Sequence, residues 1–292
     1  MNNPLLLLLG TGAMLGFYFP LGKLAVQGGV DPVLWAMLIC VGAGVSMAML
    51  SRTVEGRSDN VKVWRYAVIS GFLSYVVPHF LTFSAIPKIG SGLAAIMFAL
   101  SPVTTALLSL ILKVRPPSGL GLIGIGLGLL GALIIIFARN GNFEGQTLWL
   151  ALAALIPVFL GLGNVYRTLA WPKGAGPLRL ASLTNLAAVP PLLVIAYAMN
   201  GAIDLEPLAR VPLLVIAQLI VTAAMFVMFF RLQQLGGPTY LSQIGYVGAV
   251  VGVGIGVIWL SEIYPAGVWA GAGVVALGIA LTTLAQVRLA KT

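Results

Sequence analysis

The sequence predicts an all-α membrane protein with ten transmembrane helices, arranged as two inverted five-helix repeats. The first observation is composition: 60% of the 292 residues are apolar, 8% are charged, and the mean hydropathy is +1.05. Soluble domains usually carry about a quarter of their residues as charged side chains. The second is a series of long apolar runs, and the third is a glycine pattern that recurs in both halves of the chain. Together they predict a polytopic bundle with an internal repeat.

The apolar runs have the length of membrane-spanning helices. A helix needs about 20 mostly apolar residues to cross the hydrocarbon core. The runs are continuous and lack the alternation of membrane barrel strands, so helices are expected. The longest connection, Ser51 to Val63, leaves no room for a soluble domain. The expected spans are residues 4–26, 33–50, 64–86, 90–112, 117–138, 147–170, 178–199, 211–234, 238–259 and 265–287.

The basic residues predict the orientation of the bundle. With the amino terminus inside, twelve Lys and Arg residues fall on the inner side and four on the outer side, which together make up the 16 in the chain. Cytoplasmic loops carry the excess of Lys and Arg, so both termini are expected in the cytoplasm. This topology accounts for the net charge of +9, and no nucleic-acid partner is expected. The span ends also carry an expected interfacial belt of tryptophans: Trp35, Trp64, Trp149, Trp171, Trp259 and Trp269.

Weak internal identities divide the chain into halves, residues 1–140 and 141–292. LGFYFPLGKLA (15–25) is similar to LGLGNVYRTLA (160–170). Five spans per half is an odd number, so the second half must enter the membrane from the opposite side. Such inverted repeats are frequent in secondary transporters, whose sites lie near the midplane between the halves. A shift of 147 residues places Gly124, Gly126 and Gly131 on Gly271, Gly273 and Gly278.

The stretch FSAIPKIGSGLAAIMFALSPVTTALLSLILKVRPPSGLGLIGIGLGLLGAL (83–132), with ten spans and short loops, resembles the drug/metabolite transporter superfamily, EamA type. Within it, the chain is similar to bacterial exporters of aromatic amino acids. The resemblance implies an exporter in a bacterial inner (plasma) membrane. Family members often carry a Glu between the fourth and fifth helix of each repeat. Glu262 fits that pattern in the second half, whereas Arg115 occupies the matching place in the first.

The sequence contains no pattern typical of cation transport, nucleotide binding, metal binding or catalysis. All seven acidic residues fall at span ends or in loops, which argues against cation substrates and carboxylate-based coupling, because intramembrane charges persist only for a purpose. The GxGxxG pattern from Gly119 to Gly124 has no preceding strand, so helix packing is the better interpretation. No metal-ligand cluster, acid pair or Ser-His arrangement is recognisable by spacing. We therefore expect no enzyme activity, no cofactor and no metal.

His79 is the only histidine, and the only readily titratable side chain well inside a span. Helical spacing places Phe72, Tyr75 and Phe83 on its face. Pro78 removes a backbone donor and leaves the Ser74 carbonyl free one turn earlier. Two interpretations stay open: a neutral His hydrogen-bonded within the bundle, or a residue of a substrate site.

Other polar or aromatic residues fall near the middle of spans. Each could line a substrate cavity or simply tie helices together. Thr239, Gln243 and Tyr246 follow the spacing i, i+4, i+7 and are expected on one helical face. The candidate substrate-binding residues, besides His79, Tyr75 and Phe83, are Tyr18, Ser101, Asn164, Tyr166, Thr239, Gln243 and Tyr246.

The expected function, with direction and substrate class implied by the resemblance, is export of small zwitterionic metabolites, above all amino acids including aromatic ones. Alternating access around a midplane cavity is the expected mechanism. A broad drug efflux protein or a nucleotide-sugar type carrier is the alternative, and a channel or an intramembrane enzyme belongs to a different class. The expected partners are a small-molecule substrate and membrane lipids.

Overall fold

The computed structural model describes residues 3–54, 61–112, 118–138, 146–242 and 244–289, and these residues form helices without any strand. The first half holds α1 (Pro4–Gln27), α2 (Pro32–Val54), α3 (Val61–Gly71), the π-helical turn η1 (Phe72–Val76), α4 (Val77–Ile89), α5 (Ser91–Ala99), α6 (Ser101–Ile111) and α7 (Gly119–Ala138). The second half holds α8 (Gln146–Ala153), α9 (Leu155–Leu169), α10 (Pro177–Asn200), α11 (Glu206–Arg210), α12 (Pro212–Ser242), α13 (Ile244–Ile258) and α14 (Ala266–Leu289).

The all-helical prediction is confirmed for the described residues. Seven helical stretches among them are long and apolar enough to cross a membrane. Each of the other three expected spans contains a shorter apolar helix: Gly119–Ile135, Ile244–Ile258 and Ala266–Leu281.

The third expected span does not run as one uniform helix. It consists of α3, η1 and α4, and the Val77 N–H bonds to the Phe72 carbonyl across the wider π turn. The sequence predicts a disturbance near Pro78, and the structure places this π turn immediately before it. Because a π turn takes more residues than an α turn, it changes which side chains share a face. Phe72, expected on the face of His79, is instead 47% exposed.

The boundary between the eighth and ninth expected spans is corrected by the structure. α12 continues to Ser242, beyond the expected end at residue 234. Glycine and proline do not stop it, because in an apolar bundle a continued helix is the simplest way to satisfy backbone groups. Thr239 therefore belongs to α12 and Tyr246 to α13. Thr239 and Tyr246 thus do not share one helix as expected, and Gln243 lies outside the described residues.

The tryptophan belt also needs one correction. Trp64, Trp171, Trp259 and Trp269 are exposed, as interfacial anchors should be. Trp35 is 0% exposed and belongs to the main core. It lies in the first turn of α2, on the side that packs into the bundle.

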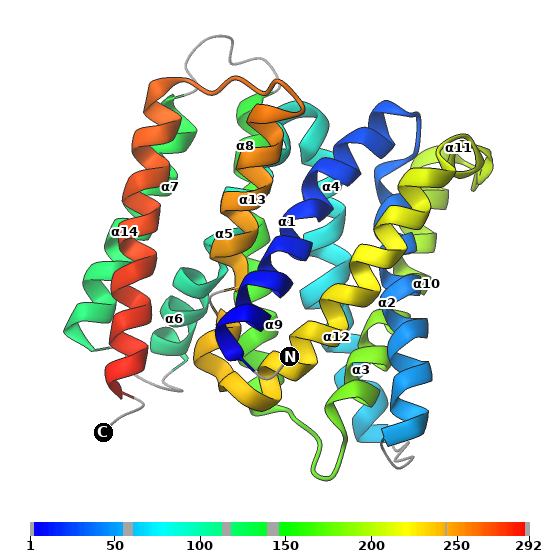
Figure 1. Cartoon of the computed structure of the whole chain (residues 1–292), viewed down its shortest axis with the longest axis horizontal. Helices are drawn as coiled ribbons and strands as arrows, with labels where there is room; N and C mark the ends of the chain where they lie inside the picture. Colours follow the sequence, from blue (N-terminus) through cyan, green and yellow to red (C-terminus); the bar gives the residue numbers. More distant parts are fainter. Residues whose placement is uncertain (1–2, 55–60, 113–117, 139–145, 243, 290–292) are drawn as a thin grey trace.

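The helices form one bundle in which α7 and α14 stand together at one edge (Figure 1). The start of α1 and the end of α14 point toward the same end of the bundle, at the bottom of Figure 1. The α1–α2 and α13–α14 connections and α11 lie at the opposite end, called the outer end below. The names inner and outer follow the orientation expected from the basic residues.

Glycines bring α7 and α14 into backbone contact. A Cβ atom added to Gly131 would lie 2.8 Å from the Gly271 carbonyl oxygen, and one added to Gly278 would lie 2.7 Å from the Gly124 carbonyl oxygen. The 147-residue shift pairs Gly124 with Gly271 and Gly131 with Gly278. Gly131 thus contacts Gly271, the equivalent of Gly124, and Gly124 contacts Gly278, the equivalent of Gly131. The two helices run antiparallel at this contact. A two-fold axis between the helices would produce this reciprocal pattern.

Candidate functional site

An aromatic face runs along η1 and α4 in the middle of the bundle. The rings of Tyr75 and His79 lie 5.7 Å apart at 68°, and those of His79 and Phe83 lie 5.9 Å apart at 78°. His79 is 8% exposed and Phe83 is 2% exposed. The sequence correctly places these three side chains on one face. No hydrogen bond joins the imidazole to any other described residue, so its nitrogens are available to a ligand.

Tyr18 of α1 faces this aromatic strip from a neighbouring helix. Its ring is buried, and its hydroxyl lies near Tyr75 and near Thr222 of α12. Thr222 accepts a 3.1 Å hydrogen bond from Gln218 Nε2 one turn earlier. The Tyr18 hydroxyl itself has no hydrogen bond of ordinary geometry within the described residues. α1, η1 and α12 therefore bring unsatisfied polar groups to the same region.

Asn164 and Arg167 of α9 approach the strip from another side. Asn164 Nδ2 donates to Thr105 Oγ1 at 3.0 Å, and Asn164 Oδ1 accepts a hydrogen bond from the Arg167 guanidinium. The guanidinium lies beside the Tyr75 hydroxyl. Arg167 is only two residues from the end of its span, whereas Tyr75 lies midway along the span Val61–Ile89. The Arg167 side chain therefore points into the bundle, although its backbone lies near a span end as the sequence predicts.

Two residues near Tyr75, Tyr18 and Asn185, each have a buried polar atom without a hydrogen bond among the described residues. In folded proteins such atoms usually have a partner, so each exception needs an explanation such as a water or a ligand. Ser74 directly precedes Tyr75, Asn185 of α10 lies beside its hydroxyl, and Thr82 follows His79 by one turn. The buried side-chain atoms without a hydrogen bond among the described residues are Tyr18 Oη, Trp35 Nε1, Ser70 Oγ, Ser74 Oγ, Thr82 Oγ1, Asn185 Oδ1 and Gln218 Oε1.

The other sequence candidates lie farther from this group. The Ser101 carbonyl accepts from Thr105 Oγ1 at 2.7 Å, which links it to Asn164. The Tyr166 ring stacks on Tyr66 at 5.9 Å, within a separate apolar cluster where α3, α9 and α10 meet. Tyr246 is half-buried in α13 against the main core. Thr239 lies in α12, and nothing is described for Gln243.

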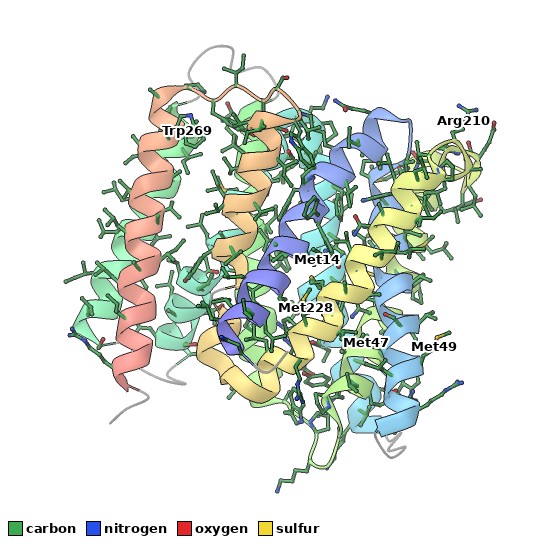
Figure 2. The ribbon with its side chains drawn as sticks, viewed as in Figure 1. Met14, Met47, Met49, Arg210, Met228 and Trp269 are labelled. Carbon is green, nitrogen blue, oxygen red and sulfur yellow. The ribbon has the colours of Figure 1, made fainter. Side chains whose placement is uncertain are left out.

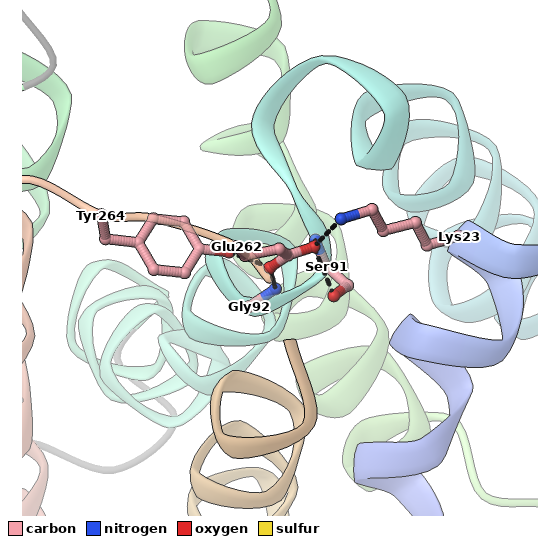
Figure 3. Close-up of polar contacts among 5 residues, drawn as sticks. All are labelled: Lys23, Ser91, Gly92, Glu262 and Tyr264. Carbon is pink, nitrogen blue, oxygen red and sulfur yellow. Dashed lines mark hydrogen bonds and ion pairs between the residues drawn. The ribbon is translucent and has the colours of Figure 1, made fainter. Parts of the chain in front are cut away.

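A second polar site lies at the outer end, around Glu262 in the segment between α13 and α14 (Figure 3). Glu262 Oε1 accepts from Lys23 Nζ, Ser91 N and Ser91 Oγ, each at 2.7 Å. Glu262 Oε2 accepts from Gly92 N at 3.0 Å and from the Tyr264 hydroxyl. The Glu262 side chain is 5% exposed and that of Lys23 is 16% exposed. One carboxylate thus joins α1, the start of α5 and the α13–α14 segment.

Glycines make room for this carboxylate. A Cβ at Gly256 would lie 2.5 Å from Glu262 Oε2, and a Cβ at Gly92 would lie 2.9 Å from the Tyr264 hydroxyl. Gly90, with φ of 88°, turns the chain directly into α5. The first N–H groups of a helix have no partner within the helix and carry partial positive charge. Glu262 satisfies two of them from a distant part of the sequence.

Comparison with known protein families finds one similarity. The sequence profile of the EamA-like transporter family matches residues 2–137, the part of the chain that contains α1 to α7. The match covers slightly less than half of the chain, and it is a similarity to a family of membrane transporters. Together with the apolar helices of spanning length, it supports an integral membrane protein.

The fold of the whole chain has a match among solved structures. A structure titled only "Crystal structure of protein" superposes with a TM-score of 0.62, and the match covers 95% of this chain and 98% of that one. At 19% sequence identity this match supports the fold alone. In total, 28 chains of solved structures match. No curated protein matches the sequence.

The electrostatics of the outer site indicate a structural role for Glu262. Burial by itself raises the pKa of Glu262, but the hydrogen bonds from Lys23, Tyr264 and the Gly92 and Ser91 N–H groups outweigh it and lower the pKa to about 2. Burial, together with the neighbouring carboxylate, raises the pKa of Tyr264. Glu262 therefore stays ionised at neutral pH. Its hydrogen bonds join α1, α5 and the α13–α14 segment.

Sequence reasoning missed several residues of both sites. Lys23 and Glu262 are 239 residues apart, and no local spacing connects them. Arg167 and Asn185 were not among the candidates, because one lies near a span end and the other lies in a helix that was not expected to line the cavity. Gln218 and Thr222 did offer a signal, since they are polar residues four apart in an apolar run.

Proposed function

We propose that this chain is an EamA-type transporter that exports small zwitterionic metabolites, above all amino acids including aromatic ones. The observation that carries the proposal is the aromatic strip of Tyr75, His79 and Phe83, with the unpaired buried polar atoms of Tyr18 and Asn185 near Tyr75. Ligand sites typically combine apolar and aromatic walls with a few polar groups that fix orientation. An aromatic amino acid offers both a ring to pack on the strip and a polar head.

The charges near the strip support a zwitterion over a cation. All four carboxylates in the described part of the chain lie between the spans: Asp31, Asp204, Glu206 and Glu262. A cationic substrate would need a carboxylate or a similar counter-charge inside the bundle. His79, Asn164 and Tyr18 offer neutral donors and acceptors instead. A molecule with both charges and no large net charge suits this lining.

The proposed mechanism is alternating access between two inverted halves, residues 1–140 and 141–292. The reciprocal glycine contacts between α7 and α14 support it, because they follow the pattern that a two-fold axis produces. The Glu262 network ties α1 and α5 of the first half to the second half at the outer end. Release of substrate to the outside would require this network to open.

Two other carriers are weaker candidates. A broad efflux protein for apolar drugs would use the aromatic strip but not the unpaired polar atoms. A nucleotide-sugar carrier would need several cations for its phosphates, and Arg167 is the one cation that the described residues bring to Tyr75. A channel or an intramembrane enzyme belongs to a different class. Counterflow exchange separates a carrier from a channel, and recovery of unchanged substrate excludes an enzyme.

The proposed orientation has both termini in the cytoplasm of a bacterial inner membrane. A reporter fused after Lys291 should report the cytoplasm, and one inserted after Ile203 should report the outside. A cytoplasmic signal at Ile203 would reverse the sidedness used throughout this proposal.

The deciding experiment is uptake into liposomes that contain the purified protein. Radiolabelled aromatic and aliphatic amino acids, an apolar cationic drug and a nucleotide sugar are compared with protein-free liposomes. We expect saturable uptake and counterflow for aromatic amino acids. Uptake of the drug or the nucleotide sugar without uptake of any amino acid would refute the proposal.

A further inference from the structure

We infer that Arg167 and Asn185, both near the Tyr75 hydroxyl, form the subsite for the charged head of the substrate. Arg167 binds the carboxylate, and Asn185 Oδ1 accepts the ammonium group. The inference rests on the proposed function and adds to it the residues that select an α-amino acid over an amine or a simple acid.

Arg167 lacks a counter-charge within the described part of the chain. Asp31 accepts from Val33 N at 2.8 Å, Leu34 N at 3.0 Å and Asn200 Nδ2 at 3.1 Å. Asp204 accepts from Glu206 N, Glu206 pairs with Arg210, and Glu262 is held in its own network. All four described carboxylates are therefore occupied at the outer end. A charged side chain turned into a bundle is costly and persists for a function, and a guanidinium is well shaped to bind a carboxylate through two parallel hydrogen bonds.

The direction of the Arg167 side chain favours a substrate over a lipid headgroup. An arginine near a span end usually extends toward the membrane surface and its phosphates. Here the guanidinium lies beside the Tyr75 hydroxyl, midway along the span Val61–Ile89. Asn164 holds it there, and Thr105 in turn holds Asn164. This chain of contacts positions the cation for a ligand inside the bundle.

Asn185 supplies the complementary acceptor. The residue is 0% exposed, its Nδ2 donates to the Ala181 carbonyl at 2.9 Å, and its buried Oδ1 has no partner among the described residues. Asn185 lies beside the Tyr75 hydroxyl, as Arg167 does. A donor and an acceptor near one hydroxyl match the carboxylate and ammonium carried by a single α-carbon. The His79 and Phe83 rings continue from Tyr75 and offer a surface to the substrate side chain.

The test compares three probes that share one ring: L-phenylalanine, 3-phenylpropionate without the amine, and 2-phenylethylamine without the carboxylate. Competition against phenylalanine uptake is measured for wild type, Arg167→Gln, Arg167→Lys and Asn185→Leu in liposomes. Arg210→Gln is the matched control, because Arg210 is exposed at the outer end. Folding of each variant is checked by gel filtration and thermal unfolding.

Loss of a hydrogen bond to a charged group should raise the KM for phenylalanine about 10-fold or more in Arg167→Gln. Arg167→Lys should recover part of this loss, and Arg210→Gln should match wild type. Asn185→Leu should weaken the binding of phenylalanine but not that of 3-phenylpropionate, which has no ammonium group. In wild type, 3-phenylpropionate should compete better than 2-phenylethylamine.

Three results would overturn the inference. Arg167→Gln could fold and keep the wild-type KM and probe preference. The amine could compete as well as the acid in wild type, a measurement that needs no variant to fold. The effect of Arg167→Gln could vanish in liposomes without anionic lipid, which would make a lipid phosphate the ligand. If wild type takes up no amino acid at all, the proposed function fails as well, so the two failures are distinguishable.

Discussion

Lys23 Nζ and Glu262 Oε1 lie 2.7 Å apart and join α1 to the α13–α14 segment across 239 residues of sequence. The same oxygen accepts from the Ser91 N–H at the start of α5. A charge-assisted hydrogen bond is shorter and stronger than a neutral one, and this carboxylate makes several of them in a largely buried position. It is therefore a point at which the two halves of the chain are fastened.

Replacement of Glu262 by Gln should destabilise the protein by about 1 to 3 kcal/mol, the usual cost of leaving buried hydrogen-bonding groups without partners. Both oxygens of the Glu262 carboxylate accept hydrogen bonds in wild type. In the variant, the NH2 group of glutamine replaces one of these oxygens and leaves its donors without an acceptor. Thermal unfolding in detergent measures the change. Glu206→Gln is the matched control, because its ion pair with Arg210 is exposed and worth less than about 1 kcal/mol. Equal losses in both variants would contradict a fastening role for Glu262.

The Glu262 network should also make stability depend on acid pH. The pKa of Glu262 is lowered from 4.5 to about 2 in the folded protein. A carboxylate whose pKa is lowered on folding stabilises the protein at pH values above its ordinary pKa. That stabilisation is lost as the pH falls through the range from about 4.5 to 2. Melting temperatures across this window should therefore fall more steeply for wild type than for Glu262→Gln. Parallel curves for the two proteins would show that Glu262 is not responsible.

The contact between α7 and α14 should be sensitive to single methyl groups. A Cβ at Gly278 would lie 2.5 Å from the Gly128 backbone nitrogen, whereas a Cβ at Gly273 of the same helix would meet nothing within 4 Å. Gly278→Ala should cost about 1 to 3 kcal/mol because rigid backbones must move apart, and Gly273→Ala should cost nothing measurable. Thermal unfolding of both variants tests this difference. A tolerated Gly278→Ala would mean that the helices pack less closely than described.

His79 should contact substrate without acting as an obligatory proton carrier. His79→Gln retains a donor and an acceptor, so it should keep part of the transport rate, whereas His79→Leu removes both and should lose more. Uptake of a neutral zwitterion into liposomes should persist when a protonophore collapses the pH difference. Accumulation that is driven by a pH gradient alone, and that disappears in His79→Gln, would instead make His79 a proton site.

Much of the helical layout followed from the sequence, because apolar runs of spanning length leave the backbone few alternatives in a membrane. The face shared by Tyr75, His79 and Phe83 followed from helical spacing alone. The same reasoning failed for Phe72, where a π turn changes the spacing, and for Thr239, which a continuing α12 removes from the helix of Tyr246. Local spacing predicts a face only while the helix stays regular.

The sequence by itself determined that this chain is a helical membrane protein, which residues are apolar enough to span, and that one histidine lies inside. Only the tertiary structure decided that Glu262 meets Lys23 and the start of α5, and that Arg167 and Asn185 both lie near Tyr75. The physical reason is that hydropathy and helical periodicity are local properties of consecutive residues. The partner of a charge depends instead on which helices pack together and how each is rotated, and both are set by the packing of the whole bundle.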